Sequence, residues 1–426
     1  MSGSGKIDAA LRARAEAVIP GGMYGHQSVR PLPDGYPQFF QRGEGAYLWD
    51  VDGQRYIDFM CGYGPNLFGY AHREVDDAYV ERLRQGDALT GPGPAMVELA
   101  EAMTAQVAHA DWTMFCKNGT DATTMALMVA RRHTRKNTVV LATGAYHGAA
   151  PWCTPNKAGV TAADRANQVF CTYNDVESLE AAVRAAGPDL AAIFAAPIKH
   201  DAFVDQQLPT VDYARRAREL CDEHGALLIV DDVRAGFRLA RDCSWSLVGV
   251  KPDLSTWGKS IANGHPLSAL LGSDIARAAA GEIYVTGSFW YAAAPMAAAL
   301  VTLRLIRETN YLEHTVAMGE RLRAGLGTLA ARHGVGLRQT GPAQMPLFLF
   351  EDDAGFGKGF FWSRAVLDGG VYVHPWHNMF MCAALTEADI DQALDAAESA
   401  FKRLVKAGPQ PPAAQLGIRL APAAAA

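Results

Sequence analysis

The stretch "ALLIVDD" at residues 226–232 decides the fold. Five apolar residues follow one another without a polar interruption and end in two aspartates. A strand is apolar at every position when both of its faces are buried, as in the parallel sheet of an α/β protein. We therefore expect a central strand covered by helices on both sides, with Asp231 and Asp232 at its carboxyl end.

The segments before this strand alternate between two hydrophobic patterns. Short apolar runs alternate with amphipathic helical patterns, namely 112–116, helix 120–134, 138–143, helix 175–186, 191–195, helix 212–224 and 226–231. This alternation predicts an α/β fold with a large, mostly parallel sheet. In open α/β sheets, ligands bind beyond the carboxyl ends of the strands. Residues at strand ends are therefore the first candidates for a functional site.

The two ends of the chain have a different character. Helical spacing at 7–18 is followed by "GAYLWDVDGQRYIDFM" (45–60), which alternates around Asp52-Gly53 as a hairpin does. After residue 310 the pattern is that of an α+β lobe with helices at 311–333 and 386–405. We expect 66–310 to form a large domain, and 1–65 and 311–426 to contribute to a small one.

Composition excludes several classes of protein. The 426 residues are 49% hydrophobic and 20% charged, and the net charge of −6 gives no support to nucleic-acid or anionic-membrane binding. Seven scattered cysteines without CxxC pairs suit reduced thiols, and no signal peptide or membrane span is visible. Histidines show no metal-binding spacing. We expect a cytoplasmic protein with no membrane partner and no metal.

Two strand-to-helix junctions carry candidate binding residues. In "FCKNGTDATTMA" (115–126), Gly119 and Thr120 open a helix whose first N–H groups suit a phosphate. A capped helix without a ligand explains the same residues. In "GAYHGAA" (144–150), Tyr146 and His147 form either an aromatic platform or an ordinary turn.

Two further junctions carry charge. Asp231 closes a buried strand and needs a partner, which is a cationic ligand nitrogen or a salt bridge to Arg234 or Arg238. Lys259 follows the β-prone run that ends at Trp257, and desolvation there lowers the pKa of an amine and makes it nucleophilic. A surface lysine is the simpler alternative.

These four junctions together fit pyridoxal 5'-phosphate. That cofactor needs a lysine for its aldehyde, a carboxylate for its ring nitrogen, an aromatic side chain for its ring face and a helix N-terminus for its phosphate. All four residue types occur at strand ends of one α/β domain. Their joint occurrence by chance is less probable than the chance occurrence of any one of them.

The same residues carry a resemblance to a family. "LLIVDDV…GF", Lys259 in "PDLSTWGKSIANGHPLSALLGS", "NGTDA" and "YHG" resemble the class III aminotransferases, which have fold type I of the pyridoxal-phosphate enzymes. The opening and closing segments are similar to the glutamate-1-semialdehyde aminomutase branch. Within it, "IPGGMYGHQSVR" and "YVHPWHNMF" resemble bacterial aminotransferases that deaminate fumonisin-type amino polyols.

The resemblance implies roles for the cofactor residues. Lys259 forms the Schiff base with the cofactor and moves the proton, and Asp231 holds the ring nitrogen protonated. Tyr146 stacks on the ring, with His147 beside it. The cofactor phosphate is bound by Gly119 and Thr120, and by Ser288 of the neighbouring subunit. That last role implies a homodimer with active sites at the interface.

Substrate contacts are expected where the chain departs from the family. Ala196-Pro197 replaces the usual Glu-Pro, and Arg234 adds a cation that we expect to bind the acceptor carboxylate, unless it pairs with Asp232. Trp290 suits a pocket for a bulky amine or packs at a dimer interface. The remaining candidates lie near the two ends of the chain: His26, Arg30, His374 and Trp376.

We therefore expect an aminotransferase that moves an amino group from a long or bulky primary amine to pyruvate by a ping-pong mechanism. The alternatives are a glutamate-1-semialdehyde-type 2,1-aminomutase, a β-amino acid aminotransferase, and a scaffold of the same fold without catalysis.

Overall fold

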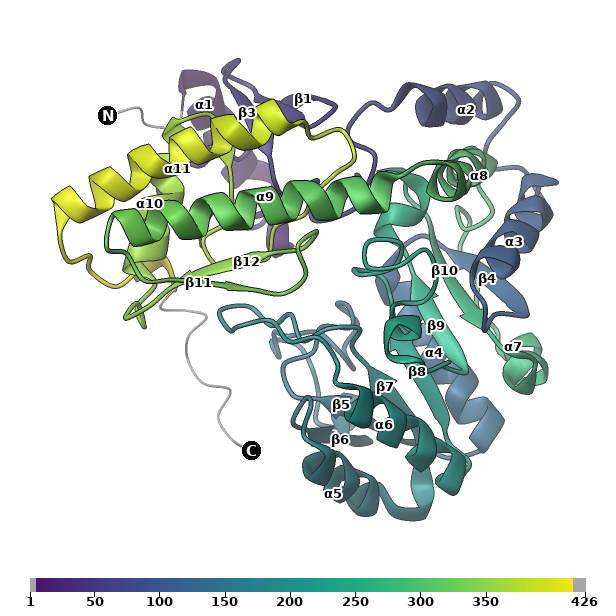
Figure 1. Ribbon diagram of the computed structural model, residues 1–426. Helices are drawn as coiled ribbons and strands as arrows, with labels where there is room; N and C mark the ends of the chain where they lie inside the picture. The colour runs from purple at the N-terminus through teal and green to yellow at the C-terminus, as the bar shows by residue number, and fades with distance from the viewer. Residues whose placement is uncertain (1–4, 417–426) are drawn as a thin grey trace. The chain divides into compact units, whose positions relative to one another are not determined.

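The computed structural model describes residues 5–416, which divide into two units by their contacts (Figure 1). The larger unit consists of Gly64–Leu67 and His72–Leu312. The smaller one consists of the chain up to Tyr63, Phe68–Ala71 and the chain from Glu313 onward. The chain thus changes unit three times between Tyr63 and His72 and once more after Leu312. Their assignment as separate domains stays a prediction.

The larger unit carries one sheet and most of the helices. Its strands are β4 (Trp112–Cys116), β5 (Thr138–Ala142), β6 (Gln168–Cys171), β7 (Leu190–Ala195), β8 (Leu227–Asp231), β9 (Leu254–Trp257) and β10 (Ser268–Gly272). Its helices are α2 (Arg73–Leu83), α3 (Ala95–Gln106), α4 (Gly119–Thr134), α5 (Val176–Ala186), α6 (Val211–His224), α7 (Arg277–Glu282) and α8 (Ala293–Glu308).

The sheet has the order β4-β10-β9-β8-β7-β5-β6, and β9, β8, β7, β5 and β6 are mutually parallel. Strand β10 runs antiparallel to both of its neighbours. The reason is the short link 258–267 between β9 and β10, because a parallel connection needs a crossover of about a dozen residues or more. The predicted α/β fold with a mostly parallel sheet is confirmed.

Strand β8 is buried along its whole length, as its composition predicts. Leu227 and Ile229 pack in one core with Ala126 and Val129 of α4. Their neighbours Leu228 and Val230 point to the other face, because side chains alternate along a strand. Helices α5 and α6 pack against the sheet through β5–β8, and the picture shows them on the side away from α4 (Figure 1). Two covered faces explain the unbroken apolar run.

The smaller unit carries two sheets. Strands β1 (Phe40–Glu44), β2 (Tyr47–Asp50), β3 (Arg55–Asp58) and β13 (Val371–Tyr372) form one, and β11 (Leu337–Thr340) pairs with β12 (Leu347–Phe350) in the other. The hairpin expected around Asp52-Gly53 joins β2 and β3, and its turn is held by the Asp50 carboxylate, which accepts hydrogen bonds from the backbone N–H groups of Asp52 (3.0 Å) and Gln54 (2.8 Å).

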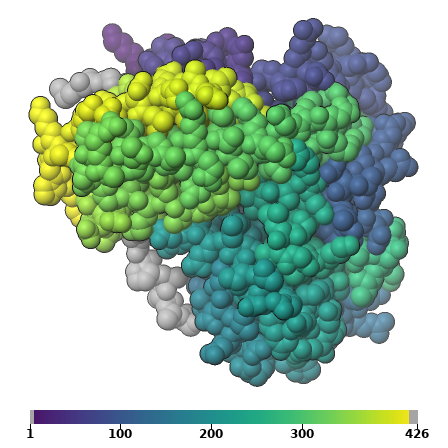
Figure 2. Space-filling model, in the orientation of Figure 1, coloured from purple at the N-terminus to yellow at the C-terminus, as the bar shows by residue number. Residues whose placement is uncertain are grey.

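Four helices accompany these sheets: α1 (Lys6–Val18), α9 (Tyr311–Arg332), α10 (Gly357–Asp368) and α11 (Glu387–Ala407). The green α9 and the yellow α11 lie side by side at the surface (Figures 1 and 2). Arg321 on α9 pairs with Asp391 on α11 at 2.7 Å. The two long helices predicted after residue 310 are therefore present and packed together.

Within residues 5–416, no helix is long and apolar enough to cross a membrane. All seven cysteines are free thiols, and all but Cys153 are buried. The same residues contain no group of three or more His, Cys, Asp or Glu side chains that could hold a metal ion.

Candidate active site

The site is built on two neighbouring strands of the larger unit. Strands β8 and β9 pair in parallel with Asp231 opposite Thr256, so Lys259 follows that register position by three residues. Both candidate residues therefore belong to the carboxyl edge of the sheet, where an open α/β fold binds its ligand.

The Asp231 carboxylate is buried and receives three hydrogen bonds. Nδ1 of His147 lies 2.7 Å from Oδ2, and the Thr256 hydroxyl donates to Oδ1 at 2.8 Å. The backbone N–H of Val233 donates to Oδ1 at 3.2 Å. Because a carboxylate only accepts, Nδ1 of His147 carries the proton. Such donors stabilise the charged form of a buried carboxyl group.

The neighbouring Asp232 points elsewhere. Its Oδ2 accepts a hydrogen bond from the backbone N–H of Ser244 at 2.8 Å, and burial raises the pKa of this carboxyl to about 6. Arg238, one of the expected salt-bridge partners of Asp231, donates from Nη2 to the carbonyl oxygen of Gly64 at 2.8 Å. The two aspartates thus serve different surroundings, and Asp231 is the one that faces the site.

Lys259 begins a short 3-10 turn directly after Gly258. Its φ of 49° lies in the left-handed region, which a non-glycine residue occupies only when its surroundings hold it there. Burial of the amine, together with the positive charges of Arg234 and Arg238, lowers the pKa of Lys259 to about 7, and the charge of Asp231 opposes that shift. Much of this amine is therefore neutral and nucleophilic at neutral pH.

Tyr146 offers an exposed aromatic face in the same region. Its side chain is 41% exposed, whereas the adjacent His147 is buried against Phe194 with ring centroids 4.6 Å apart. The charges of Arg234 and Asp231 both act on the Tyr146 hydroxyl, whose pKa burial raises. The turn after β5 therefore places a buried hydrogen-bond donor beside an open ring.

The N-terminus of α4 offers two backbone N–H groups as hydrogen-bond donors. Its cap is occupied, since Oδ2 of Asp121 accepts a hydrogen bond from the backbone N–H of Asn118 at 2.9 Å. Within residues 5–416, however, the N–H groups of Gly119 and Thr120 find no hydrogen-bond acceptor. The capped helix and the phosphate site are thus compatible, because the cap leaves two amides available for an anion.

Gly148 lies against Thr120 at the N-terminus of α4. The Thr120 hydroxyl accepts a hydrogen bond from the backbone N–H of Ala149 at 3.1 Å. A Cβ on Gly148 would lie only 2.5 Å from that hydroxyl oxygen, and the φ of Gly148 is 123°. The loop can therefore pass this close to Thr120 only with a glycine.

Sequence reasoning missed two titratable residues of the site. His200 and Asp201 follow β7, which lies between β8 and β5 in the sheet. The charges of Asp231 and Asp201 act on the partly buried Arg234, whose pKa burial lowers to about 10. The sequence pattern that could have indicated them is "HD" shortly after an apolar strand, at the edge of the sheet where ligands bind.

Two other candidates of the larger unit lie on the loop before α8. Ser288 is exposed. Trp290 is partly buried and packs against the core that α4 shares with the sheet. Packing thus accounts for part of the Trp290 surface, and a contact of either residue with cofactor or substrate stays a prediction.

The remaining candidates belong to the smaller unit. Arg30 pairs with Glu16 at 2.7 Å on the surface. The His26 ring meets Tyr63 edge-on, with centroids 4.6 Å apart. His374 and Trp376 are buried and meet edge-on at 4.3 Å. The structure thus gathers three of these side chains into aromatic packing, and their contact with a substrate stays a prediction.

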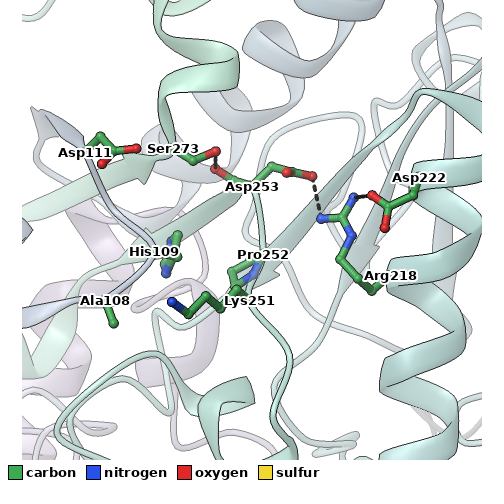
Figure 3. A pocket seen from close by; sticks show the side chains of 9 residues that line it. All are labelled: Ala108, His109, Asp111, Arg218, Asp222, Lys251, Pro252, Asp253 and Ser273. Carbon is green, nitrogen blue, oxygen red and sulfur yellow. Dashed lines mark hydrogen bonds and ion pairs between the residues drawn. The ribbon is translucent and has the colours of Figure 1, made fainter.

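A surface hollow of about 440 Å³ lies at the other edge of the sheet (Figure 3). It is lined by Asp253, which precedes β9, and by Ser273, which follows the antiparallel β10. Arg218 in this hollow pairs with Asp253 at 2.7 Å. Because these residues stand at the amino ends of the parallel strands, the hollow is separate from the site around Lys259.

The residues of the site fit the four parts of pyridoxal 5'-phosphate. They supply an amine with a lowered pKa, a hydrogen-bonded carboxylate, an open aromatic face and two unpaired amides at a helix N-terminus, which are the groups that this cofactor needs. Fold and site together define a pyridoxal-phosphate enzyme of fold type I.

The chain belongs to the class III aminotransferases, whose family model ("Aminotransferase class-III") matches residues 32–401. It is 57% identical to the aminopentol aminotransferase of Sphingopyxis macrogoltabida, over 93% of this chain and 94% of that one. It is 32% identical to a glutamate-1-semialdehyde 2,1-aminomutase of Nitrosospira multiformis, over 92% and 98% of the two chains.

A solved structure agrees with this membership. The FumI protein of Sphingopyxis sp. MTA144, in its pyridoxal-phosphate internal aldimine form, superposes with a TM-score of 0.95 at 56% identity, over 96% of this chain and 99% of that one. The protein is therefore a pyridoxal-phosphate-dependent aminotransferase, as its sequence predicts.

The first prediction concerns the Lys259 amine in the cofactor-free protein. Pulse labelling with an amine-reactive reagent, resolved by peptide mass spectrometry, will show a labelling rate that rises with pH around a midpoint near 7, because only the neutral amine reacts. Arg234→Met will move this midpoint upward by removing a positive charge, whereas Arg215→Met, an exposed change, will not. Lys251 in the same sample is the internal reference. A Lys259 midpoint near 10.5 would contradict the desolvated site.

The second prediction concerns Gly148. Gly148→Ala will weaken cofactor binding about tenfold or more, because the new Cβ displaces the Thr120 hydroxyl. Gly159→Ala is the matched control, since φ is also positive there (78°) but nothing lies within 4 Å of the added Cβ. Equilibrium titration of the cofactor-free variants measures both dissociation constants. Equal values for the two variants would show that the Gly148 loop does not shape the site.

Proposed function

We propose that this enzyme transfers the amino group of a long-chain, hydroxylated primary amine to pyruvate by a ping-pong mechanism. The observation that carries the proposal is the 57% identity, over nearly the whole chain, to an enzyme named for an aminopentol substrate. The site adds a positively charged group, Arg234, in the same electrostatic cluster as Lys259.

Lys259 is the base in this proposal. The bound cofactor supplies an electron sink that stabilises negative charge on the substrate carbon next to nitrogen. A lysine with a pKa of about 7 accepts a proton from that carbon and returns it during one turnover, since a general base works best when its pKa lies near the working pH. Its left-handed backbone and the adjoining Gly258 direct the amine from the end of β9.

The other residues of the site would bind the cofactor and orient it. Asp231 would pair with the ring nitrogen, and its hydrogen bonds from His147 and Thr256 fix the direction of the carboxylate. The open face of Tyr146 would cover the ring. The N–H groups of Gly119 and Thr120 would bind the phosphate at the positive end of α4.

Arg234 would bind the carboxylate of pyruvate. Its pKa of about 10 leaves the guanidinium charged at neutral pH, although the side chain is partly buried. A partly buried cation near the reacting amine is a suitable partner for the acceptor carboxylate, because such charge-assisted pairs are strong and directional. The charges of Asp231 and Asp201 offset part of its desolvation.

A second copy of the chain would complete the site. Ser288 is exposed, and its neighbour Phe289 is 65% exposed. Tyr284, earlier on the same loop, is 86% exposed. Large aromatic side chains this exposed suit an interface between subunits. A homodimer in which Ser288 approaches the partner's cofactor phosphate is therefore part of the proposal, as is a cytoplasmic location.

The third prediction separates the possible reactions. The holoenzyme, given a long-chain amino polyol and pyruvate, will form alanine in proportion to the amine consumed. Alanine from α- or β-amino acids only would contradict the long-chain donor, and conversion of an amino aldehyde without any acceptor would favour the aminomutase.

The same assay tests Arg234. Arg234→Ala will raise the KM for pyruvate about 10- to 100-fold, the range expected for losing a charge-assisted hydrogen bond, and leave the KM for the amine nearly unchanged. Arg234→Lys will restore part of the affinity, and Arg215→Ala is the surface control. An unchanged KM for pyruvate in a folded, cofactor-loaded Arg234→Ala enzyme would contradict the role of Arg234 in binding the pyruvate carboxylate.

A further inference from the structure

His200 stands at the carboxyl edge of the sheet between the two parts of the site. It follows β7, whose neighbours are β8, ending at Asp231, and β5, followed by His147. The segment after β7 is held in place, because Lys199 and Gln207 exchange backbone hydrogen bonds of 2.8 and 3.1 Å. The ring is thus carried by an ordered turn.

One hydrogen bond assigns the proton on this ring. Nδ1 of His200 lies 2.8 Å from the carbonyl oxygen of Ile198. A carbonyl oxygen only accepts, so Nδ1 carries the hydrogen, and in the neutral ring Nε2 keeps an unshared electron pair. Within residues 5–416 no side chain or backbone group donates a hydrogen bond to this Nε2, and the ring is only partly buried.

The surroundings keep the ring neutral. Burial and the positive charge of Arg234, with smaller effects of His147 and Lys259, hold the pKa of His200 well below its usual value. The bond to Ile198 acts in the opposite direction and does not outweigh them. His200 is therefore a neutral hydrogen-bond acceptor in a region that also contains the positive charges of Arg234 and Lys259.

This chemistry selects which substrate His200 can contact. The carboxylate and carbonyl oxygens of a keto acid are acceptors, so the acceptor substrate has no donor for Nε2. The nitrogen of the amine substrate would be engaged by the bound cofactor. The group that remains is a hydroxyl of the amine, which donates one hydrogen bond.

We propose that Nε2 of His200 accepts a hydrogen bond from a hydroxyl group of the amine donor and thereby selects donors that are hydroxylated close to the amino carbon. This assignment rests on the proposed function and makes it more specific. A site built to bind a substrate hydroxyl discriminates against the analogue without it, because the protein group is then left unpaired.

Two donors of equal chain length test the proposal: a 2-aminoalkan-3-ol and the corresponding 2-aminoalkane, each with pyruvate and the holoenzyme. The wild type will favour the hydroxylated amine about 5- to 20-fold in kcat/KM. His200→Phe will abolish this preference, so that the ratio of the two kcat/KM values falls to about 1. His200→Gln, which keeps an acceptor, will retain part of the preference.

Binding is read separately from turnover. The 3-hydroxy ketone product will inhibit the wild type more strongly than the plain ketone, and His200→Phe will remove this difference. His133→Phe, near the far end of α4, is the control for replacing a histidine. Thermal unfolding of each variant will report whether the fold is kept.

Each outcome is decisive. An equal loss for both donors in His200→Phe, or a preference that survives the change, overturns the assignment of His200 and leaves the aminotransferase proposal standing. Absence of alanine with either donor in the wild type contradicts the proposed function and the inference that rests on it.

Discussion

The buried Asp231 carboxylate is the constraint on which the rest of the site depends. A carboxylate at the end of a strand covered on both faces is costly unless donors surround it. Here the donors come from three places in the chain: the turn after β5, strand β9 and the backbone after β8. Satisfying one charge therefore fixes the relative positions of His147, Thr256 and the strand end. The same interaction leaves Tyr146 beside the site, because it is the residue before His147.

Lys259 shows the complementary effect of local charge. The positive charges of Arg234 and Arg238 act on its amine and disfavour a third positive charge, and the negative charge of Asp231 opposes them. Among the groups that act on this amine, the two arginines outnumber the aspartate. That balance suits a phosphorylated cofactor and a keto acid, both anions, and makes the lysine a base near neutral pH. Arg234 lowers the pKa of Lys259 and His200 as well as offering a partner to a carboxylate, so one residue links acceptor binding to the protonation of the site.

The sequence was sufficient to predict the fold, and it also singled out the strand-end residues that the structure places at one edge of the sheet, because both follow from short-range patterns. The unbroken apolar run at β8, the glycine-rich turns and the lysine after Trp257 each report a local environment. The direction of β10 follows only from the short link 258–267, and strand β6, at the sheet edge with an exposed Phe170, had no comparable apolar run. His200 was missed because its role depends on the charge of Arg234 and on the Ile198 carbonyl, which the chain order does not bring together. Arg30, a candidate substrate contact, forms an ion pair with Glu16 that no local sequence pattern indicates.

The central claim is that the hydrogen-bonded Asp231 carboxylate keeps the cofactor ring nitrogen protonated. The most direct measurement is the ¹⁵N NMR shift of pyridoxal phosphate labelled at the ring nitrogen, bound to the wild type and to Asp231→Asn. Asparagine keeps the size of the side chain and removes its charge. The account predicts a protonated ring nitrogen at neutral pH in the wild type and a loss of that proton in the variant. A ring nitrogen that is unprotonated in the wild type, or protonated equally in both proteins, would contradict it.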